Sequence, residues 1–130
     1  MGVSLALKAG LVIALISGED SNLVDRFAIK FGLTDVYKGS KDKAASLRDF
    51  AQRRGLELQQ IAFMGDDVND VEAMRLCGLA AAPANAHPAA LRAATFVSER
   101  SGGHGAVREM IDCIIDARRE LAEVAAPVAQ

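Results

Sequence analysis

Three carboxylates follow a short apolar run in the middle of the chain. Residues 61–64 lead directly into Gly65, and Asp66, Asp67 and Asp70 come next. Like charges this close repel one another unless a cation neutralises them, and Mg²⁺ prefers oxygen ligands of this kind. The simpler alternative is that one aspartate only caps the following helix. A cap needs one carboxylate, so the others favour a metal site, and we predict that all three bind Mg²⁺.

Two positions far from this turn are suited to an anion. Ser17 and Gly18 follow the apolar run 11–16, so a hydroxyl and backbone N–H groups lie beside a helix start, where phosphate binds. A plain turn is the simpler alternative. Lys43 opens a predicted helix, where a cation opposes the helix dipole unless it reaches toward an anion. The alternative there is a solvated lysine, like its neighbour Lys41.

A glycine-rich turn with one histidine precedes the last predicted helix. Gly103 and His104 belong to this turn, and we retain both as candidate substrate-binding residues. The alternative is a purely local role at a helix start. We expect His87, which stands beside Pro88, only to shape its loop.

Stretches with helical periodicity alternate with short runs rich in valine, isoleucine and phenylalanine. This alternation is typical of a parallel sheet covered by helices, so we predict an α/β, Rossmann-like fold. Ligands of such sheets gather at the carboxyl ends of the strands, where the candidate residues lie. We expect strands at 11–16, around 36–37, and at 61–64, 79–82 and 95–97. We expect helices at 3–8, between Asp20 and Gly32, between Ser40 and Gly55, around 68–74, between Pro83 and Thr95, and from Val107 toward the end.

Composition limits the classes of function. The 130 residues are 51% apolar, enough for one domain with its own core. Fifteen basic residues against 17 acidic ones create no field for nucleic acid. The opening run is too short to span a bilayer, and Cys77 and Cys113 lack the spacing of a zinc or redox motif. We therefore expect a cytoplasmic protein with neither nucleic-acid nor membrane partners, a core at 1–122 and a flexible tail at 123–130.

In order, Ser17-Gly18, Lys43 and Gly65-Asp66-Asp67 with Asp70 resemble the second, third and fourth motifs of haloacid dehalogenase-superfamily phosphatases. The runs at 102–109 and 86–88 resemble the 3-deoxy-D-manno-octulosonate 8-phosphate phosphatases and related sialic-acid-type phosphatases. The resemblance implies a Rossmann-like core without a cap domain, Mg²⁺, a phosphoaspartyl intermediate and a phosphorylated sugar-acid substrate. It also implies a homotetramer in which the tail of one subunit closes a neighbour's site.

The same resemblance implies a role for each matched residue. Ser17 would hydrogen-bond the phosphoryl group, and Lys43 would offset its charge and orient the nucleophile. Asp66 would ligate Mg²⁺, with Asp67 supporting the site. The chain departs from the family pattern in two places. No Asp-x-Asp, the motif that carries the nucleophile and general acid, occurs in it, and residues 19–20 are acidic where the subfamily often carries arginine.

The Asp-x-Asp strand lies in the family fold between the strands matched by 11–16 and 61–64. We therefore predict a truncated core whose sheet is altered or completed by a partner. The two strands would pair directly, borrow a strand from another chain, or leave buried groups unpaired at about 1–3 kcal/mol each.

The resulting prediction is a Mg²⁺-dependent phosphatase-family protein, by family a phosphoric monoester hydrolase, with little or no turnover as this exact chain. The alternative is a non-catalytic oligomerisation module of the same fold. A receiver-like domain is disfavoured, because its acidic pair should come early in the chain and its lysine late.

Overall fold

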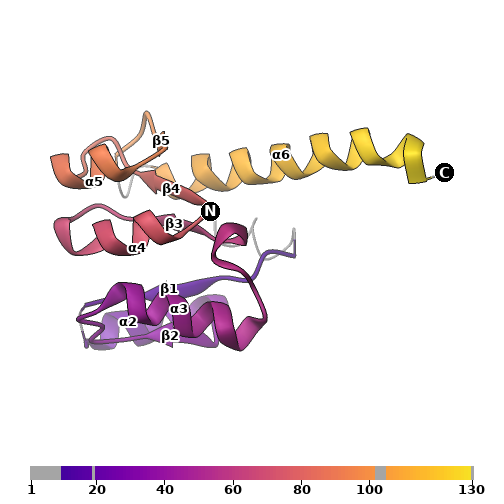
Figure 1. Ribbon diagram of the computed structural model, residues 1–130. Helices are drawn as coiled ribbons and strands as arrows, with labels where there is room; N and C mark the ends of the chain where they lie inside the picture. Colours follow the sequence, from indigo (N-terminus) through magenta and orange to yellow (C-terminus); the bar gives the residue numbers. More distant parts are fainter. Residues whose placement is uncertain (1–9, 19, 102–104, 130) are drawn as a thin grey trace.

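The computed structural model describes residues 10–18, 20–101 and 105–129, with residues 118–129 described by their backbone alone. Strands and helices alternate as predicted, and parallel sheets are flanked by helices (Figure 1). The helix predicted at 3–8 lies outside the described residues. None of the described helices combines the length and the apolar character needed to cross a membrane.

Most elements fall where the sequence pattern predicted them. The first strand is shorter than predicted, because only its last three residues pair with a neighbour. The strands are β1 (Ala14–Ile16), β2 (Asp35–Tyr37), β3 (Ala62–Met64), β4 (Leu79–Ala82) and β5 (Phe96–Val97). The helices are α2 (Asn22–Phe31), α3 (Lys43–Arg54), α4 (Val71–Leu76), α5 (Pro88–Ala93) and α6 (Ala106–Ala129), with 3₁₀ turns η1 (Leu58–Gln60) and η2 (Val68–Asp70).

Local chemistry explains where α2 and α3 begin and end. Both helices end at a glycine in the left-handed conformation, Gly32 with φ 65° and Gly55 with φ 64°, which residues with a Cβ rarely adopt. Asp42 caps the start of α3, where its carboxylate accepts a hydrogen bond of 3.0 Å from the backbone N–H of Ala45. This cap places Lys43 in the first turn of α3.

The strands form two separate parallel sheets. One contains β1 and β2, with Ala14 opposite Asp35, and the other has the order β3-β4-β5. Within the described part of the chain, β1 and β3 do not pair. Of the three outcomes predicted for the sheet, direct pairing of these two strands is therefore not seen there. The prediction of an altered or partner-completed sheet stays a prediction.

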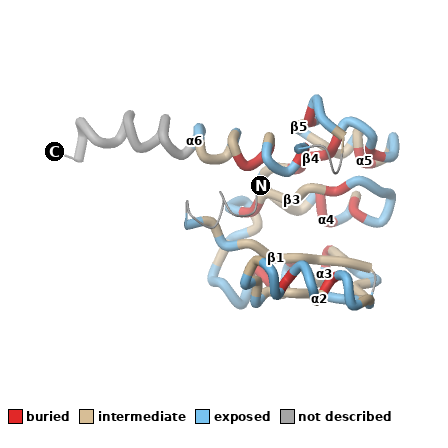
Figure 2. Tube along the Cα trace, turned by 180° about the vertical axis from the view of Figure 1, so that it is seen from behind, coloured by how far each residue is buried: buried red, intermediate tan, exposed pale blue. Residues whose placement is uncertain are grey.

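Helix α3 packs against both sheets and holds them together. Its buried residues Leu47 and Phe50 form a core cluster in which Ile16 of β1 and Phe63 of β3 also take part. A second cluster lies under β4, where Ala80 and Ala82 are covered by Met74 of α4 and by α5. Buried residues accordingly line the inward sides of the helices (Figure 2). Among the residues that the structure describes, the two sheets are thus joined through helix packing and not through backbone hydrogen bonds.

Helix α6 follows the last strand and runs past the strands toward the carboxyl terminus (Figure 1). It packs on the rest of the molecule near its start, where Ala106, Met110 and Ile111 are buried. The structure continues it as a helix to Ala129. The flexibility predicted for residues 123–130 stays a prediction.

Candidate active site

The carboxyl ends of β1 and β3 meet at one hollow of about 560 Å³. Ser17 and Gly18 line it from the end of β1, Asp66 and Asp67 from the end of β3, and Lys43 from the start of α3. The position of Ser17 is held by its backbone, since its N–H donates to the carbonyl of Tyr37 and its carbonyl accepts from Ser40, both at 2.8 Å. Residues distant in sequence thus share one rim, as expected for parallel strands.

The acidic turn after β3 depends on Gly65. Its N–H donates to the carbonyl of Ala81 at 3.0 Å, which continues the pairing of β3 with β4. A Cβ on Gly65 would lie 2.5 Å from the Cβ of Asp70 and 2.9 Å from the sulfur of Met74. Only a residue without a side chain allows η2 to fold back this closely. Gly65 therefore lets Asp70 approach the start of its own turn.

Asp70 is the centre of a buried hydrogen-bond network. One of its carboxylate oxygens accepts from the ammonium of Lys43 at 2.7 Å. The other accepts from the backbone N–H groups of Asp66 and Asp67, at 2.9 and 3.1 Å. The side chains of Lys43 and Asp70 are only 13% and 4% exposed. This network fixes Lys43 relative to the acidic turn.

The network shifts the pKa values of two aspartates in opposite directions. Burial alone would raise the pKa of Asp70, but the Lys43 ammonium and the backbone donors together hold it below its usual value. Burial, followed by the negative charge of Asp70, raises the pKa of Asp66. Asp66 therefore lies in a site where a cation would be favourable.

The three aspartates predicted to bind metal have different surroundings. Asp70 has both carboxylate oxygens hydrogen-bonded, and Asp67 accepts from the N–H of Val68 at 2.7 Å, while Asp66 lies at the hollow. No cluster of three or more acidic, histidine or cysteine side chains arranged for a metal is found among the residues that the structure describes. Metal binding by the three residues stays a prediction, and Asp66 is the member whose surroundings most favour a cation.

Two other predicted residues, Gly103 and His104, lie outside the described residues, so their substrate role stays a prediction. His87 has the local role expected for it, because its Nδ1 accepts from the N–H of Ala89 at 3.0 Å. Its own backbone N–H donates to the carbonyl of Asp66 at 2.8 Å. His87 thereby ties the loop before α5 to the acidic turn.

The sequence prediction missed three residues that line the hollow, Ser40, Lys41 and Asn69. Ser40 and Lys41 follow β2, and neither was named as a site residue. The hydroxyl of Ser40 lies 2.7 Å from that of Ser46, and the ammonium of Lys41 lies 3.4 Å from the carbonyl oxygen of Gly18. The sequence signal was partial, because a strand parallel to β1 must end at the same edge, but only the pairing of β2 with β1 brings Ser40 and Lys41 to this hollow.

Comparison with known proteins agrees with this geometry. The sequence profile of the haloacid dehalogenase-like hydrolases matches residues 12–111. A 3-deoxy-D-manno-octulosonate 8-phosphate phosphatase of Escherichia coli K12 is 33% identical over 122 residues, which is 94% of this chain and 65% of the relative. The chain thus spans just under two thirds of the length of that relative.

Solved structures with the same name superpose closely on the chain. The enzyme from Moraxella catarrhalis, in complex with a magnesium ion, a phosphate ion and KDO, has a TM-score of 0.87 at 29% identity and covers 98% of this chain and 73% of its own. The cobalt-bound form of the phosphatase from Haemophilus influenzae has a TM-score of 0.86 at 32% identity. The match covers 89% of this chain and 68% of the chain from Haemophilus influenzae. The fold around the hollow is therefore shared with these proteins.

Proposed function

The chain belongs to the haloacid dehalogenase-like hydrolases, and on this premise we propose that its hollow binds the phosphoryl group of a sugar-acid phosphate beside Mg²⁺. The observation that carries this proposal is the arrangement of Ser17, Lys43 and Asp66 around one hollow at the ends of parallel strands. A hydroxyl, an ammonium and a carboxylate on one rim supply the donors and the metal ligand that phosphoryl binding needs.

The residues present fit a magnesium ion. Mg²⁺ is usually held by one or two carboxylates together with waters and substrate phosphates. Asp66 supplies one carboxylate at the hollow, and its raised pKa reflects burial and the nearby charge of Asp70. Asp67 lines the same hollow. When bound, the ion would neutralise charge on the phosphoryl oxygens.

The side chains of the chain itself have separate tasks in this proposal. Ser17 and the backbone of Gly18 hydrogen-bond the phosphoryl oxygens. Lys43 is oriented by its 2.7 Å bond to Asp70, and an ammonium carries further donors that remain for the phosphoryl group. Asp70 is then a positioning residue, which holds the ammonium of Lys43 at a fixed place beside the acidic turn.

The substrate class is proposed from the relatives. The named relatives are phosphatases of 3-deoxy-D-manno-octulosonate 8-phosphate, and one solved structure holds magnesium, phosphate and KDO together. We propose this sugar-acid phosphate, or a related nonulosonate phosphate, as the ligand. Lys41, exposed at the rim of the hollow, is the candidate partner for a sugar carboxylate.

Turnover requires a nucleophile in line with the phosphorus. The 130 residues contain no Asp-x-Asp, and Asp67 and Asp70 accept hydrogen bonds from their own turn. We therefore propose that this polypeptide by itself binds the substrate but turns it over slowly or not at all. Efficient Mg²⁺-dependent release of phosphate by the purified chain would contradict this part of the proposal and leave the binding part intact.

Calorimetric titration with inorganic phosphate, with and without Mg²⁺, tests the binding part. We expect phosphate binding to require Mg²⁺, Asp66→Asn to abolish it and Ser17→Ala to weaken it at least about tenfold, as expected for loss of a charge-assisted hydrogen bond. Asp112→Asn is the matched control, because Asp112 is paired on α6 with Arg108, away from the hollow. Phosphate binding that is equally strong without Mg²⁺ and in Asp66→Asn would exclude the proposal.

The second candidate, a non-catalytic oligomerisation module, is favoured by one surface feature. Helix α2 exposes the apolar side chains of Leu23 (69%) and Ile29 (80%), which the surface of another subunit could cover. Light scattering combined with Mg²⁺ titration separates the candidates, since a module of this kind would form oligomers without binding metal.

Cys113 and the half-buried Cys77 are free thiols, which supports a cytoplasmic setting.

A further inference from the structure

Two serine hydroxyls form a pair beside the hollow. The Oγ atoms of Ser40 and Ser46 lie 2.7 Å apart, and either of them can be the donor. Ser40 lines the hollow, whereas Ser46 lies in α3, outside this lining. Within the described part of the chain, each hydroxyl has the other as its hydrogen-bond partner. Capping does not explain the pair, because Asp42 already caps α3.

Backbone hydrogen bonds hold Ser40 beside Ser17. The N–H of Ser40 donates to the carbonyl of Ser17 at 2.8 Å, and the N–H of Ser17 donates to the carbonyl of Tyr37 at the same distance. These two bonds tie the loop after β2 to the end of β1, and Gly39, with a φ of 59°, turns the chain between them. Ser17 and Ser40 therefore line the hollow from neighbouring positions that the backbone fixes.

The pair has one hydrogen more than it uses. A hydroxyl carries one hydrogen to donate, so the bond between Ser40 and Ser46 uses one of two. When Ser46 donates to Ser40, the remaining hydrogen belongs to the side chain that lines the hollow. A phosphate dianion only accepts hydrogen bonds, so it favours this direction. Each bond in a chain from Ser46 through Ser40 to the anion then polarises and strengthens the next.

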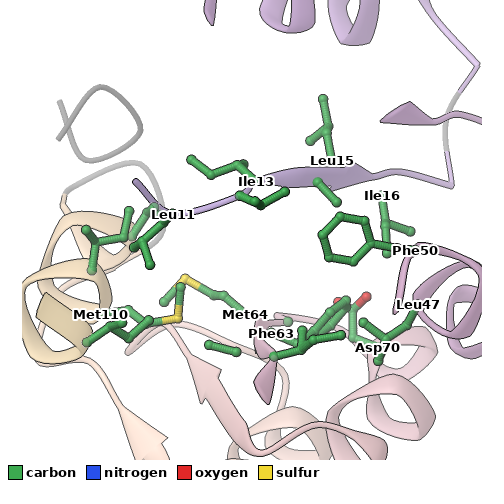
Figure 3. Close-up of a pocket in the computed structure, with 18 of the residues that line it drawn as sticks. Leu11, Ile13, Leu15, Ile16, Leu47, Phe50, Phe63, Met64, Asp70 and Met110 are labelled. Atoms are coloured by element: carbon green, nitrogen blue, oxygen red, sulfur yellow. The ribbon is translucent and has the colours of Figure 1, made fainter. Parts of the chain in front are cut away.

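The apolar cavity that adjoins the hollow is a poor site for an anion. This cavity of about 500 Å³ shares Lys43 and Asp66 with the hollow. Its labelled side chains in Figure 3 are apolar apart from Asp70, whose carboxylate already accepts a hydrogen bond from Lys43. A charged ligand in such surroundings would lose its hydration without gaining hydrogen bonds. An anion is therefore expected in the hollow, beside Ser40.

We propose that Ser40 donates a hydrogen bond to the phosphoryl group in the hollow, and that Ser46 is a positioning residue that orients the hydroxyl of Ser40 toward it. This inference rests on the proposed function, because it adds a donor to the same phosphoryl site. Ser40 thus recognises the phosphoryl group, while its neighbour Lys41 remains the candidate partner of the sugar carboxylate.

Calorimetric titration of the purified 130-residue protein with inorganic phosphate and Mg²⁺ tests the role of Ser40. We expect Ser40→Ala to weaken phosphate binding at least about tenfold, as for the loss of a hydrogen bond to a charged group. Ser40→Thr keeps a hydroxyl and should retain most of the affinity. Ser98→Ala is the matched control, because it removes a serine hydroxyl that pairs with Glu109, outside the lining of the hollow. Its phosphate affinity should equal that of the wild type.

Ser46 is tested through Ser40. We expect Ser46→Ala to weaken phosphate binding by about threefold, less than Ser40→Ala does, because the donor itself stays in place. Adding Ser46→Ala to Ser40→Ala should cause no further loss, since Ser46 acts only through the missing hydroxyl. A pair that merely tied the loop to α3 would give equal losses of phosphate affinity in the two single variants. That result would overturn the proposal.

The same titrations separate this inference from the proposed function. If Asp66→Asn and Ser17→Ala lose phosphate binding while Ser40→Ala keeps it, the phosphoryl site stands and the role of Ser40 is wrong. If the wild type binds no phosphate with Mg²⁺, the proposed function fails and this inference fails with it. A loss in Ser40→Ala that affects the sugar-acid phosphate but not inorganic phosphate would also contradict it, because Ser40 would then contact the sugar.

Discussion

The ion pair of Lys43 and Asp70 is the structural centre of the candidate site. A buried carboxylate is tolerated here because an ammonium and two backbone N–H groups surround it. The same contacts fix the shape of the acidic turn and the direction of the lysine. At the scale of single residues, binding geometry and folding stability thus depend on one network.

We predict that Lys43→Met lowers the free energy of unfolding by about 3 kcal/mol, because it leaves the charge of Asp70 buried without its partner. Lys41→Met removes an exposed lysine two residues away, and this variant should change the free energy of unfolding by less than about 0.5 kcal/mol. Urea denaturation of both variants measures the difference. Equal losses of unfolding free energy in the two variants would show that the buried pair of Lys43 and Asp70 stabilises the fold no more than an exposed lysine does.

Tyr37 allows a direct optical test, because it is the only tyrosine and the chain has no tryptophan. Burial, and then a 2.7 Å hydrogen bond from its hydroxyl to Asp49, raise its pKa to about 12. We expect the tyrosinate absorbance of the folded protein to appear well above pH 10, and at lower pH in Asp49→Asn. Titration near the ordinary value of about 10 would contradict the partly buried, hydrogen-bonded geometry of Tyr37.

The sign of the linked stability change follows from the raised pKa of Tyr37. The phenol is neutral below its pKa, so its contribution to stability is fully present below the unfolded value of about 10. It is lost as the pH rises from there toward the folded value of about 12. Urea denaturation at increasing alkaline pH should show this loss in the wild type. Tyr37→Phe should lack this component.

At the scale of elements, close backbone approaches decide which positions must be glycine. The N–H of Gly78 donates to the carbonyls of Leu58 and Ile61, both at 3.0 Å, where the turn before β4 crosses the start of β3. A Cβ on Gly78 would lie 2.0 Å from the backbone oxygen of Gln59. This crossing sets the pairing of β3 with β4, and it leaves no room for a side chain.

We predict that Gly78→Ala lowers the free energy of unfolding by at least about 2 kcal/mol, since backbone must move to admit the methyl group. Gly55→Ala is the comparison, because Gly55 has open space but a φ of 64°, which costs a residue with a Cβ about 1 kcal/mol. Urea denaturation of the two variants separates the steric cost from the conformational one. A larger loss for Gly55→Ala would contradict this assignment.

At the scale of the whole molecule, the two sheets differ in how well they are supported. Strand β4 lies between two partners and has fully buried residues at Ala81 and Ala82. Strand β1 has one partner and is only partly buried. Their connection depends on the packing of α3 and not on strand pairing. We therefore expect the two sheets to unfold less cooperatively than the strands of one continuous sheet would.

We predict that the amides of β4 exchange with deuterium at least about 100 times more slowly than those of β1 in the native protein. The reason is that strands with fewer partners open by local fluctuations of lower free energy. Hydrogen exchange followed by NMR gives both rates. Equal protection of β1 and β4 would show that the two sheets unfold as a single unit.

The sequence alone determined the class of fold and several of the residues that meet at the hollow. The alternation of periodicities predicted parallel strands, and Gly32 and Gly55 marked helix ends because their positive φ excludes most residues. The convergence of Ser17, Lys43 and Asp66 was predictable as well, since carboxyl ends of parallel strands meet at one edge. These features depend on local chemistry and on general rules of chain topology.

Only the tertiary structure decided how those participants are used. Asp70 was predicted as a metal ligand, but its carboxylate meets Lys43, 27 residues away in the chain. Likewise, Ser40 and Lys41 join the hollow because β2 pairs with β1. The separation of β1 from β3 is also a matter of packing, because α3 can hold both sheets without joining their edges. Contacts between distant residues carry no local periodicity, so the sequence pattern does not contain them.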